Sequence, residues 1–204
     1  MITIHATKKL YAHLPVAATM NPPPSDDSAA TPPDSADNPL SGWHANLLTL
    51  QRRLCVVLVH DATRFPLFMK GLVKADFANF DRLFADTLMN TLLKLGANQT
   101  QMDSASALLA PCRFDTDCNR SVQGTMNQMA GDIEHMLRFD HTKLDDICSY
   151  RTGVWLADRP CTLKGQKDCI WPEKAMLALL TEAGRGVDSA NVKNNIVHLG
   201  SRDG

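Results

Sequence analysis

The hydrophobic pattern of this chain changes near residue 75, from short strand-like runs to helical spacing. Before that point, strand patterns occupy four segments, Ile2–His5, Trp43–Leu47, Leu54–Val59 and Phe65–Met69. The links Gln51-Arg52 and Asp61-Ala62-Thr63 are short enough for hairpins, which favours antiparallel pairing of the strands that they join. A further edge strand is predicted at residues 113–117.

After that point, apolar residues recur at helical spacing between recognisable start and stop signals. Five helices are predicted. The first follows an Asp76 N-cap and stops at Gly96, and the second ends before Pro111. The third is capped by Asn119, the fourth covers residues 144–155 with Thr142 as its cap, and the fifth starts at Pro172. Strands first and helices afterwards indicate an α+β domain. We therefore expect an antiparallel sheet of about four or five strands, with helices packed on one face.

Residues 1–183 are expected to form one α+β domain, because a chain of 204 residues is long enough for a single sizeable core. The tract 20–39 is rich in Pro, Ser, Asp and Ala, and it cannot bury enough apolar area to offset the cost of ordering the chain. We expect a disordered insertion there, with a ligand for a proline-recognition domain as the alternative. Residues 184–204 are expected to form a flexible tail.

Charge and cysteine usage exclude several classes of protein. Twenty-one basic and 22 acidic residues give a net charge of −1, too little for a field that would hold a phosphate backbone or an anionic membrane, so nucleic-acid binding is not expected. No signal peptide is recognised and no segment approaches the roughly 18 apolar residues of a membrane span, which predicts a cytoplasmic location without membrane contact. The six cysteines lack zinc-site spacing, so we expect reduced thiols, no metal and no cofactor.

The helix that follows Asn119 has two contrasting faces. One face is apolar, and the opposite face carries Arg120, Gly124, Asn127 and Gly131. Glycine inside a helix destabilises it by roughly 0.5–1 kcal/mol relative to alanine, so two glycines seven residues apart need a compensating reason. Close approach of another backbone or of a ligand is such a reason, and this face is the first candidate site.

Three segments carry a resemblance to a known family. They are Met1-Ile2-Thr3-Ile4-His5-Ala6-Thr7-Lys8-Lys9-Leu10, Leu40-Ser41-Gly42-Trp43-His44-Ala45-Asn46-Leu47-Leu48 and the motif from Asn119 to Asn127. Together they are similar to an uncharacterised bacterial family, a domain of unknown function, whose members show T-K-K-L, L-G-D-W-Y-A-N-L-L and N-R-S-V-L-G-S-M-N-D. This chain departs from that pattern at Gly42, His44, Gln123, Thr125 and Gln128. The resemblance implies no activity, but it directs attention to Trp43, Asn46, Arg120, Ser121 and Asn127.

Our first hypothesis is a non-enzymatic cytoplasmic binding or regulatory domain, such as an accessory protein of a mobile-element or toxin–antitoxin locus. It would act through a protein partner or a second copy of itself, and its contacts would involve Trp43, Asn46, Arg120, Ser121, Gly124 and Asn127. Near-neutral charge and the absence of phosphate-loop, dinucleotide and hydrolase motifs favour it.

The alternative is an enzyme that acts on a small anionic or nucleotide substrate. Arg120 would bind the anion at the positive end of its helix, Asn127 would orient it, and Ser121 or His44 would handle protons. The acidic pair Asp115 and Asp117 could recruit a divalent cation only if other ligands converged on it, and solvation is the simpler interpretation.

Overall fold

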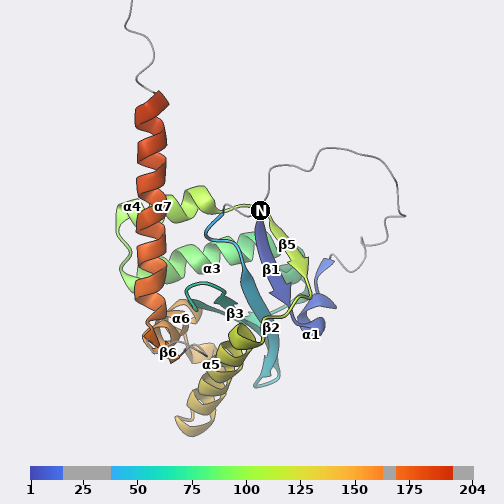
Figure 1. Cartoon of the computed structure of the whole chain (residues 1–204). Coiled ribbons are helices and arrows are strands. Elements are labelled where there is room, and N and C mark those ends of the chain that lie inside the picture. Colours follow the sequence, from blue (N-terminus) through green and yellow to red (C-terminus); the bar gives the residue numbers. More distant parts are fainter. Residues whose placement is uncertain (16–37, 163–168, 195–204) are drawn as a thin grey trace, which may run out of the picture.

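A five-stranded mixed sheet forms the centre of the computed structural model, which describes residues 1–15, 38–162 and 169–194, with side chains up to Arg185 in the last helix. The strand order is β4-β3-β2-β1-β5 (Figure 1). The strands are β1 (Ile2–Ala6), β2 (Trp43–Leu50), β3 (Arg53–His60), β4 (Pro66–Leu72) and β5 (Cys112–Asp115). These five strands confirm the five strand segments predicted from the hydrophobic pattern.

The expectation of an antiparallel sheet is wrong for β1. The strands β2, β3 and β4 pair antiparallel through short hairpins, as predicted, but β1 runs parallel to both of its neighbours, β2 and β5. Parallel strands need a crossover of a dozen or more residues, and the chain between Ala6 and Trp43 is long enough to provide it. Alternation of polar and apolar residues reports which face of a strand is buried, but it does not report which neighbour the strand pairs with.

Helices lie on both faces of this sheet, not on one as expected. They are α1 (Lys8–Tyr11), α2 (Lys74–Ala78), α3 (Phe80–Leu95), α4 (Gln99–Leu108), α5 (Arg120–Phe139), α6 (Ser149–Ala157) and α7 (Pro172–Asn194), with a 3-10 turn at Leu144–Asp146 and a small hairpin of β6 (Cys161–Thr162) and β7 (Cys169–Ile170). Residues of α1, α3, α4 and α7 join one core on one face, while α5 packs with β2 and β3 on the other.

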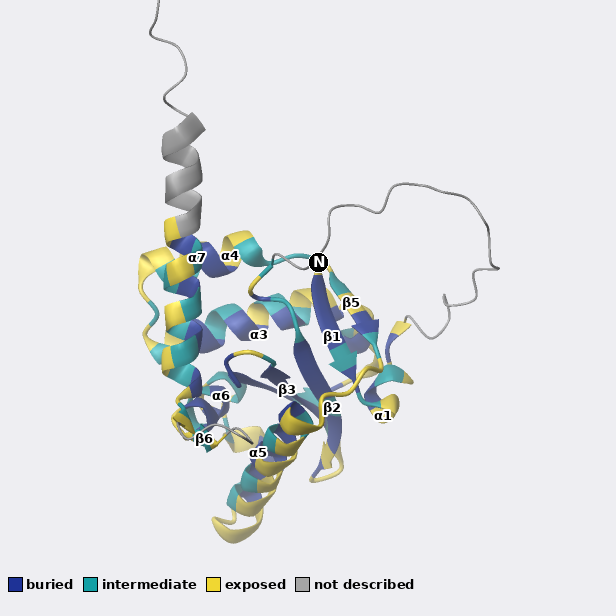
Figure 2. Cartoon of the chain, viewed as in Figure 1, coloured by how far each residue is buried: buried dark blue, intermediate teal, exposed yellow. Residues whose placement is uncertain are grey.

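The two cores follow from the alternation along the strands. On the first face, Trp43 packs edge-on against Phe84 of α3, with ring centroids 5.3 Å apart. On the second face, Val57 and Val59 pack against apolar residues of α5 such as Ile133. Figure 2 shows that α5 turns buried residues to the sheet and leaves its outer side exposed. Each face of the sheet therefore has its own hydrophobic layer.

Several predicted helix ends are confirmed and others are corrected. Gly96 ends α3 with a φ of 89°, and Asn119 caps α5 by accepting backbone N–H groups of its first turn. Asp76 is not an N-cap, because it lies inside α2, where its carboxylate accepts the backbone N–H of Val73 at 2.7 Å. The helix predicted at residues 144–155 is divided into a 3-10 turn and α6, and Thr142 caps neither of them.

The expectation of a flexible tail over residues 184–204 stays a prediction, and the structure shows that α7 continues through residue 184 to Asn194. Gly184 is buried against α4, where an added Cβ would lie 2.7 Å from Ser104 Oγ. The predicted disordered insertion at 20–39 falls almost wholly on residues 16–37, which lie outside the described part of the chain, as do residues 195–204 of the tail. Within the described residues, no helix has both the length and the apolar character needed to cross a bilayer.

Candidate functional site

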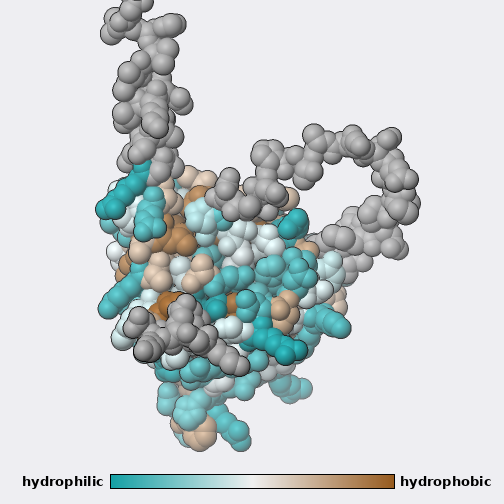
Figure 3. Space-filling model, viewed as in Figure 1, coloured by the Kyte–Doolittle hydropathy of each residue, from teal (hydrophilic) through white to brown (hydrophobic). Residues whose placement is uncertain are grey.

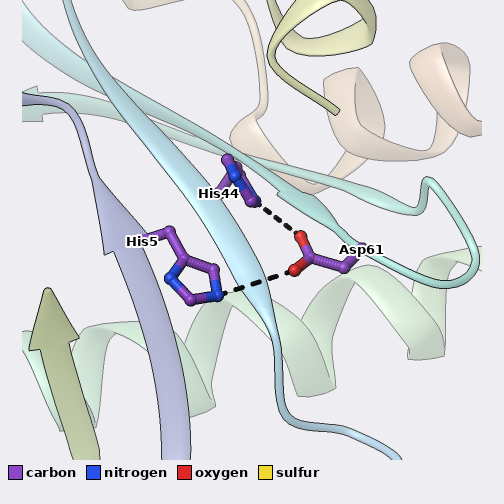
Figure 4. Close-up of side chains that lie close together, drawn as sticks. All are labelled: His5, His44 and Asp61. Carbon is purple, nitrogen blue, oxygen red and sulfur yellow. Dashed lines mark hydrogen bonds and ion pairs between the residues drawn. The ribbon is translucent and has the colours of Figure 1, made fainter. Parts of the chain in front are cut away.

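The pairing of β1 with two parallel neighbours brings three polar residues into one row. His5 on β1 lies beside His44 on β2 and beside Asp115 on β5 in the register of the sheet. Neighbouring strands are about 4.8 Å apart, and residues in register point to the same face. With Asp61, which follows β3 directly, these side chains form what we call the His–Asp cluster (Figure 4 shows His5, His44 and Asp61).

Hydrogen bonds fix the two imidazole rings. His5 Nδ1 lies 2.6 Å from Asp115 Oδ1, and His44 Nδ1 lies 2.7 Å from Asp61 Oδ1. The backbone N–H of Asn119 donates to His44 Nε2 at 2.7 Å. A backbone N–H can only donate, so His44 Nε2 is unprotonated and the ring proton lies on Nδ1, where it is donated to Asp61. Both ring nitrogens of His44 are thus committed.

The position of Asp61 depends on a glycine in the neighbouring chain segment. The backbone N–H of Asp61 donates to the carbonyl of Gly42 at 2.9 Å. Gly42 has a φ of 88°, which favours glycine, and an added Cβ would lie 3.2 Å from Asp61 Oδ2. Gly42 therefore leaves room for the carboxylate that receives His44.

A buried arginine joins this turn to the start of α5. Arg64 is only 6% exposed, and its guanidinium donates to the backbone carbonyl of Asp61 and, at 3.4 Å, to Ser121 Oγ. Its Nε has no hydrogen-bond partner among the described residues. Burial lowers the pKa of Arg64 from its ordinary value, and the negative charge of Asp61 opposes this shift. Arg64 therefore fixes the β3–β4 turn against α5.

A second buried histidine supports the strand end from behind. His60 lies against the Trp43 ring, with centroids 4.9 Å apart. Its Nε2 lies 3.2 Å from the carbonyl of Ser41 and its Nδ1 lies 2.9 Å from Thr63 Oγ1. A carbonyl can only accept, so Nε2 carries the proton and Nδ1 accepts the hydroxyl hydrogen of Thr63. Burial lowers the pKa of His60 to about 4, which keeps the ring neutral near pH 7.

The His–Asp cluster opens into a cleft. Its volume is about 510 Å³, and its lining residues are His5, His44, Asp61, Asp117, Cys118, Asn119 and Arg120. A neighbouring hollow of about 270 Å³ shares four of these residues and extends toward Thr7 and Met126. Small-molecule sites are typically clefts of roughly 300–1,000 Å³, so the larger hollow is of a suitable size.

The lining of the cleft carries charges of both signs. Arg120 supplies a positive charge beside the positive end of the α5 dipole. Asp61 and Asp117 supply negative charges. The side chain of Asn119 accepts the backbone N–H groups of Ser121 and Val122, so these two donors are already used within the helix.

The structure brings together only part of the site predicted from the sequence. Arg120 lines the cleft, and Ser121 lies beside it but contacts Arg64. Asn46 lies on the same face of the sheet and accepts a hydrogen bond from the Thr7 hydroxyl at 3.0 Å. Trp43 does not belong to this group, because it points into the opposite core and its indole N–H donates to the carbonyl of Leu40.

Gly124 and Asn127 lie further along α5 and are exposed. Among the described residues, nothing lies within 4 Å of a Cβ built on Gly124 or Gly131. Close approach of another backbone segment of the same chain therefore does not explain these two glycines. Contact with a ligand or a partner on this face stays a prediction.

Sequence reasoning missed His5 and Asp61, and it interpreted Asp115 as a solvated acid. His5 and Asp115 are separated by 110 residues and meet only because β1 and β5 pair in parallel. The available signal was the position of two of them, since His5 ends the first predicted strand and Asp61 follows the third. Both ring nitrogens of His44, one of the two residues that the enzyme hypothesis assigned to proton transfer, are already hydrogen-bonded.

Two atoms of the cluster that have no hydrogen-bond partner among the described residues face each other. His5 Nε2 and Asp61 Oδ2 are 3.7 Å apart, which is beyond the range of a hydrogen bond (Figure 4). Their partners, Asp115 and His44, hold the other atom of each group in place. Such a pair can transfer a proton or bind a cation, because an imidazole nitrogen and a carboxylate oxygen serve both uses.

Fold and site together define an α+β protein with a mixed sheet and a partly buried polar cluster where β1, β2 and α5 meet. The chain belongs to the family described as Domain of unknown function (DUF6933), whose model matches residues 3–175. The predicted membership of a domain-of-unknown-function family is thus confirmed, and the matched region contains the whole His–Asp cluster. Comparisons with curated proteins and with solved structures found no match.

Proposed function

We propose that the protein binds a small molecule that carries a phosphate or carboxylate group in the cleft between the His–Asp cluster and α5. The observation that carries this proposal is that Arg120 lines the same cleft as His5, His44 and Asp61 of the His–Asp cluster. Arginine presents several N–H donors in a planar fork that matches carboxylate and phosphate groups. The proposal keeps the anionic ligand and the role of Arg120 from the enzyme hypothesis, and it does not use Asn127 or Ser121.

The cluster supports this proposal because its geometry is fixed before a ligand arrives. Four chain segments contribute to it, and His44 is 4% exposed with both ring nitrogens hydrogen-bonded. A polar network that is held by packing and hydrogen bonds gives specificity, because a ligand does not have to order it. The free Nε2 of His5 is the group in the cleft that could exchange a proton with a bound molecule.

Isothermal titration with inorganic phosphate and with AMP tests the proposal. We expect saturable binding that Arg120→Gln weakens by about tenfold, which corresponds to the loss of one charge-assisted hydrogen bond. Arg138→Gln is the matched control, because Arg138 is exposed near the other end of the same helix and outside the cleft. Equal affinities for the two variants, or no binding of either probe by the unaltered protein, would contradict the proposal.

The exposed side of α5 supports a second candidate, self-association through that helix. Gly124 and Gly131 leave open space on the outer face, and two helices approach closely where side chains are missing. The projecting part of α5 is mostly hydrophilic in Figure 3, so such a contact would be small and polar. The earlier hypothesis of a regulatory accessory protein would use this face.

Sedimentation of the unaltered protein and of Gly124→Leu tests self-association. The new side chain meets nothing within 4 Å in the monomer, so the variant should fold and should shift the protein toward the monomer. A monomeric unaltered protein at all concentrations would remove this candidate. The phosphate titration is independent of that result.

A further inference from the structure

We propose that His5 Nε2 and Asp61 Oδ2 together bind one divalent transition-metal ion. This inference deepens the proposed function and rests on it, because both atoms belong to residues that line the same cleft. The starting observation is that His5 Nε2 and Asp61 Oδ2, which have no hydrogen-bond partner among the described residues, face each other across 3.7 Å.

The separation of these atoms suits a shared ion. Metal–nitrogen and metal–oxygen bonds of about 2.1 Å at a tetrahedral angle place the two ligand atoms roughly 3.4 Å apart. The observed 3.7 Å therefore needs a shift of only a few tenths of an ångström, or a slightly wider angle. Both atoms are already directed into the same space (Figure 4).

Asp115 and His44, which hydrogen-bond to the two proposed ligands, are arranged as in known metal sites. His5 donates its other ring N–H to Asp115, and this carboxylate fixes both the tautomer and the ring orientation. Asp61 accepts a hydrogen bond from His44 on its other oxygen. His5 Nδ1 and Asp61 Oδ1 are therefore already hydrogen-bonded, which leaves His5 Nε2 and Asp61 Oδ2 as the proposed ligand atoms.

His44 lies close enough to be counted with these ligands, but hydrogen bonding excludes it. Its Nδ1 carries the ring proton because its Nε2 accepts the backbone N–H of Asn119. A protonated nitrogen cannot bind a metal. His44 is therefore a positioning residue for Asp61, and the two proposed ligands from this chain are His5 and Asp61.

Charge gives an independent argument for a cation at this point. The row of carboxylates includes Asp61, Asp115 and Asp117. When the ring proton of His5 is on Nδ1, its Nε2 has a free lone pair that faces Asp61 Oδ2. Both atoms are then hydrogen-bond acceptors, and neither can donate to the other. A proton on Nε2 is the competing occupant, but at 3.7 Å it does not complete a hydrogen bond to Asp61. A metal ion would bind both atoms at once.

The ligand set also limits the class of ion. One imidazole nitrogen and one carboxylate oxygen suit Mn²⁺, Fe²⁺, Co²⁺ or Zn²⁺, whereas Ca²⁺ and Mg²⁺ take oxygen ligands. The remaining coordination positions would open into the cleft. Asp61 and Asp117 would otherwise repel an anion held by Arg120, and the bound ion would reduce that repulsion.

Titration of the full chain with Mn²⁺ alone tests the inference, because this ion binds thiols weakly and the chain has six cysteines. We expect one binding event per chain, with the affinity reduced at least tenfold in His5→Gln and in Asp61→Asn. His135→Gln and Cys148→Ser are the controls and should bind as the unaltered protein does, because both residues are exposed and lie outside the cleft. Far-ultraviolet circular dichroism reports whether each variant is folded.

A measurement on the unaltered protein keeps the test open if a variant fails to fold. Mn²⁺ broadens nearby proton signals, so the ring resonances of His5 and His44 should disappear at lower Mn²⁺ concentrations than those of His135. No saturable Mn²⁺ binding, or broadening of His135 together with the other two, would overturn the inference. Phosphate binding that does not need the metal would leave the proposed function intact, and metal binding without phosphate binding would leave only the metal site.

Discussion

The buried ring of His60 predicts a loss of stability on acidification. Its folded-state pKa of about 4 lies below the 6.5 of an unperturbed histidine, so between these values the unfolded chain binds a proton that the folded chain does not. Stability therefore falls as the pH falls from 6.5 toward 4. The full difference corresponds to about 3 kcal/mol, and about 2 kcal/mol of it would be lost by pH 5.

Urea unfolding of the unaltered protein and of His60→Gln at pH values of about 7 and about 5 isolates this effect. The variant keeps a donor toward the Ser41 carbonyl but has no titrating ring. We expect the unaltered protein to lose about 2 kcal/mol more than the variant over this interval. Other titrating groups are common to both chains and largely cancel in the difference.

His135→Gln is the control, because that ring is exposed on α5 and stacks only on Phe139. It should follow the pH dependence of the unaltered protein. The argument is refuted if the unaltered protein and His60→Gln lose the same free energy between the two pH values. A ring titration of His60 near pH 6.5 in nuclear magnetic resonance spectra would refute it as well.

Three substitutions, with Asn127→Ala as a control for one of them, test helix packing and capping by thermal and urea unfolding. Gly131→Ala should stabilise the protein by about 0.5–1 kcal/mol, because the new methyl group meets open space inside a helix, and a loss of stability would show that the face is occupied. Gly153→Val should destabilise it by roughly 1–3 kcal/mol, because a Cβ there lies 3.0 Å from Thr91 Cγ2, and an unchanged stability would contradict this contact. Asn119→Ala should cost about 1 kcal/mol through the loss of the α5 cap, whereas Asn127→Ala on the same helix should cost less, and equal losses would contradict the capping role.

The sequence predicted the strand segments and the α5 cap because local signals determine them. The run Leu54–Val59 could be assigned without tertiary information, since it is apolar throughout and bounded by short links. Asp76 was predicted as an N-cap, but it is the third residue of the helix and its carboxylate accepts the backbone N–H of Val73. Acidic residues are common at both positions, because at each of them the side chain can accept a backbone N–H at the helix start. Only the structure distinguishes these two roles.

The site was harder to predict because its parts are distant in the sequence. Arg120 was identified because it lies on the glycine-bearing face of a predicted helix and within the motif from Asn119 to Asn127. His5 and Asp61 have no such local signal, and their roles depend on the parallel register that sets His5 between His44 and Asp115. An antiparallel sheet, as expected at first, would not have brought those residues together.

The central position of β1 has a consequence for how the protein is made. This strand leaves the ribosome before the other elements that the structure describes, yet one of its two neighbours, β5, ends at Asp115. A nascent chain that lacks residues 112–119 has neither the carboxylate that holds His5 nor the amide that holds His44. The hairpins of β2, β3 and β4 can form early, but the polar row must wait until residues 112–119 have been synthesised.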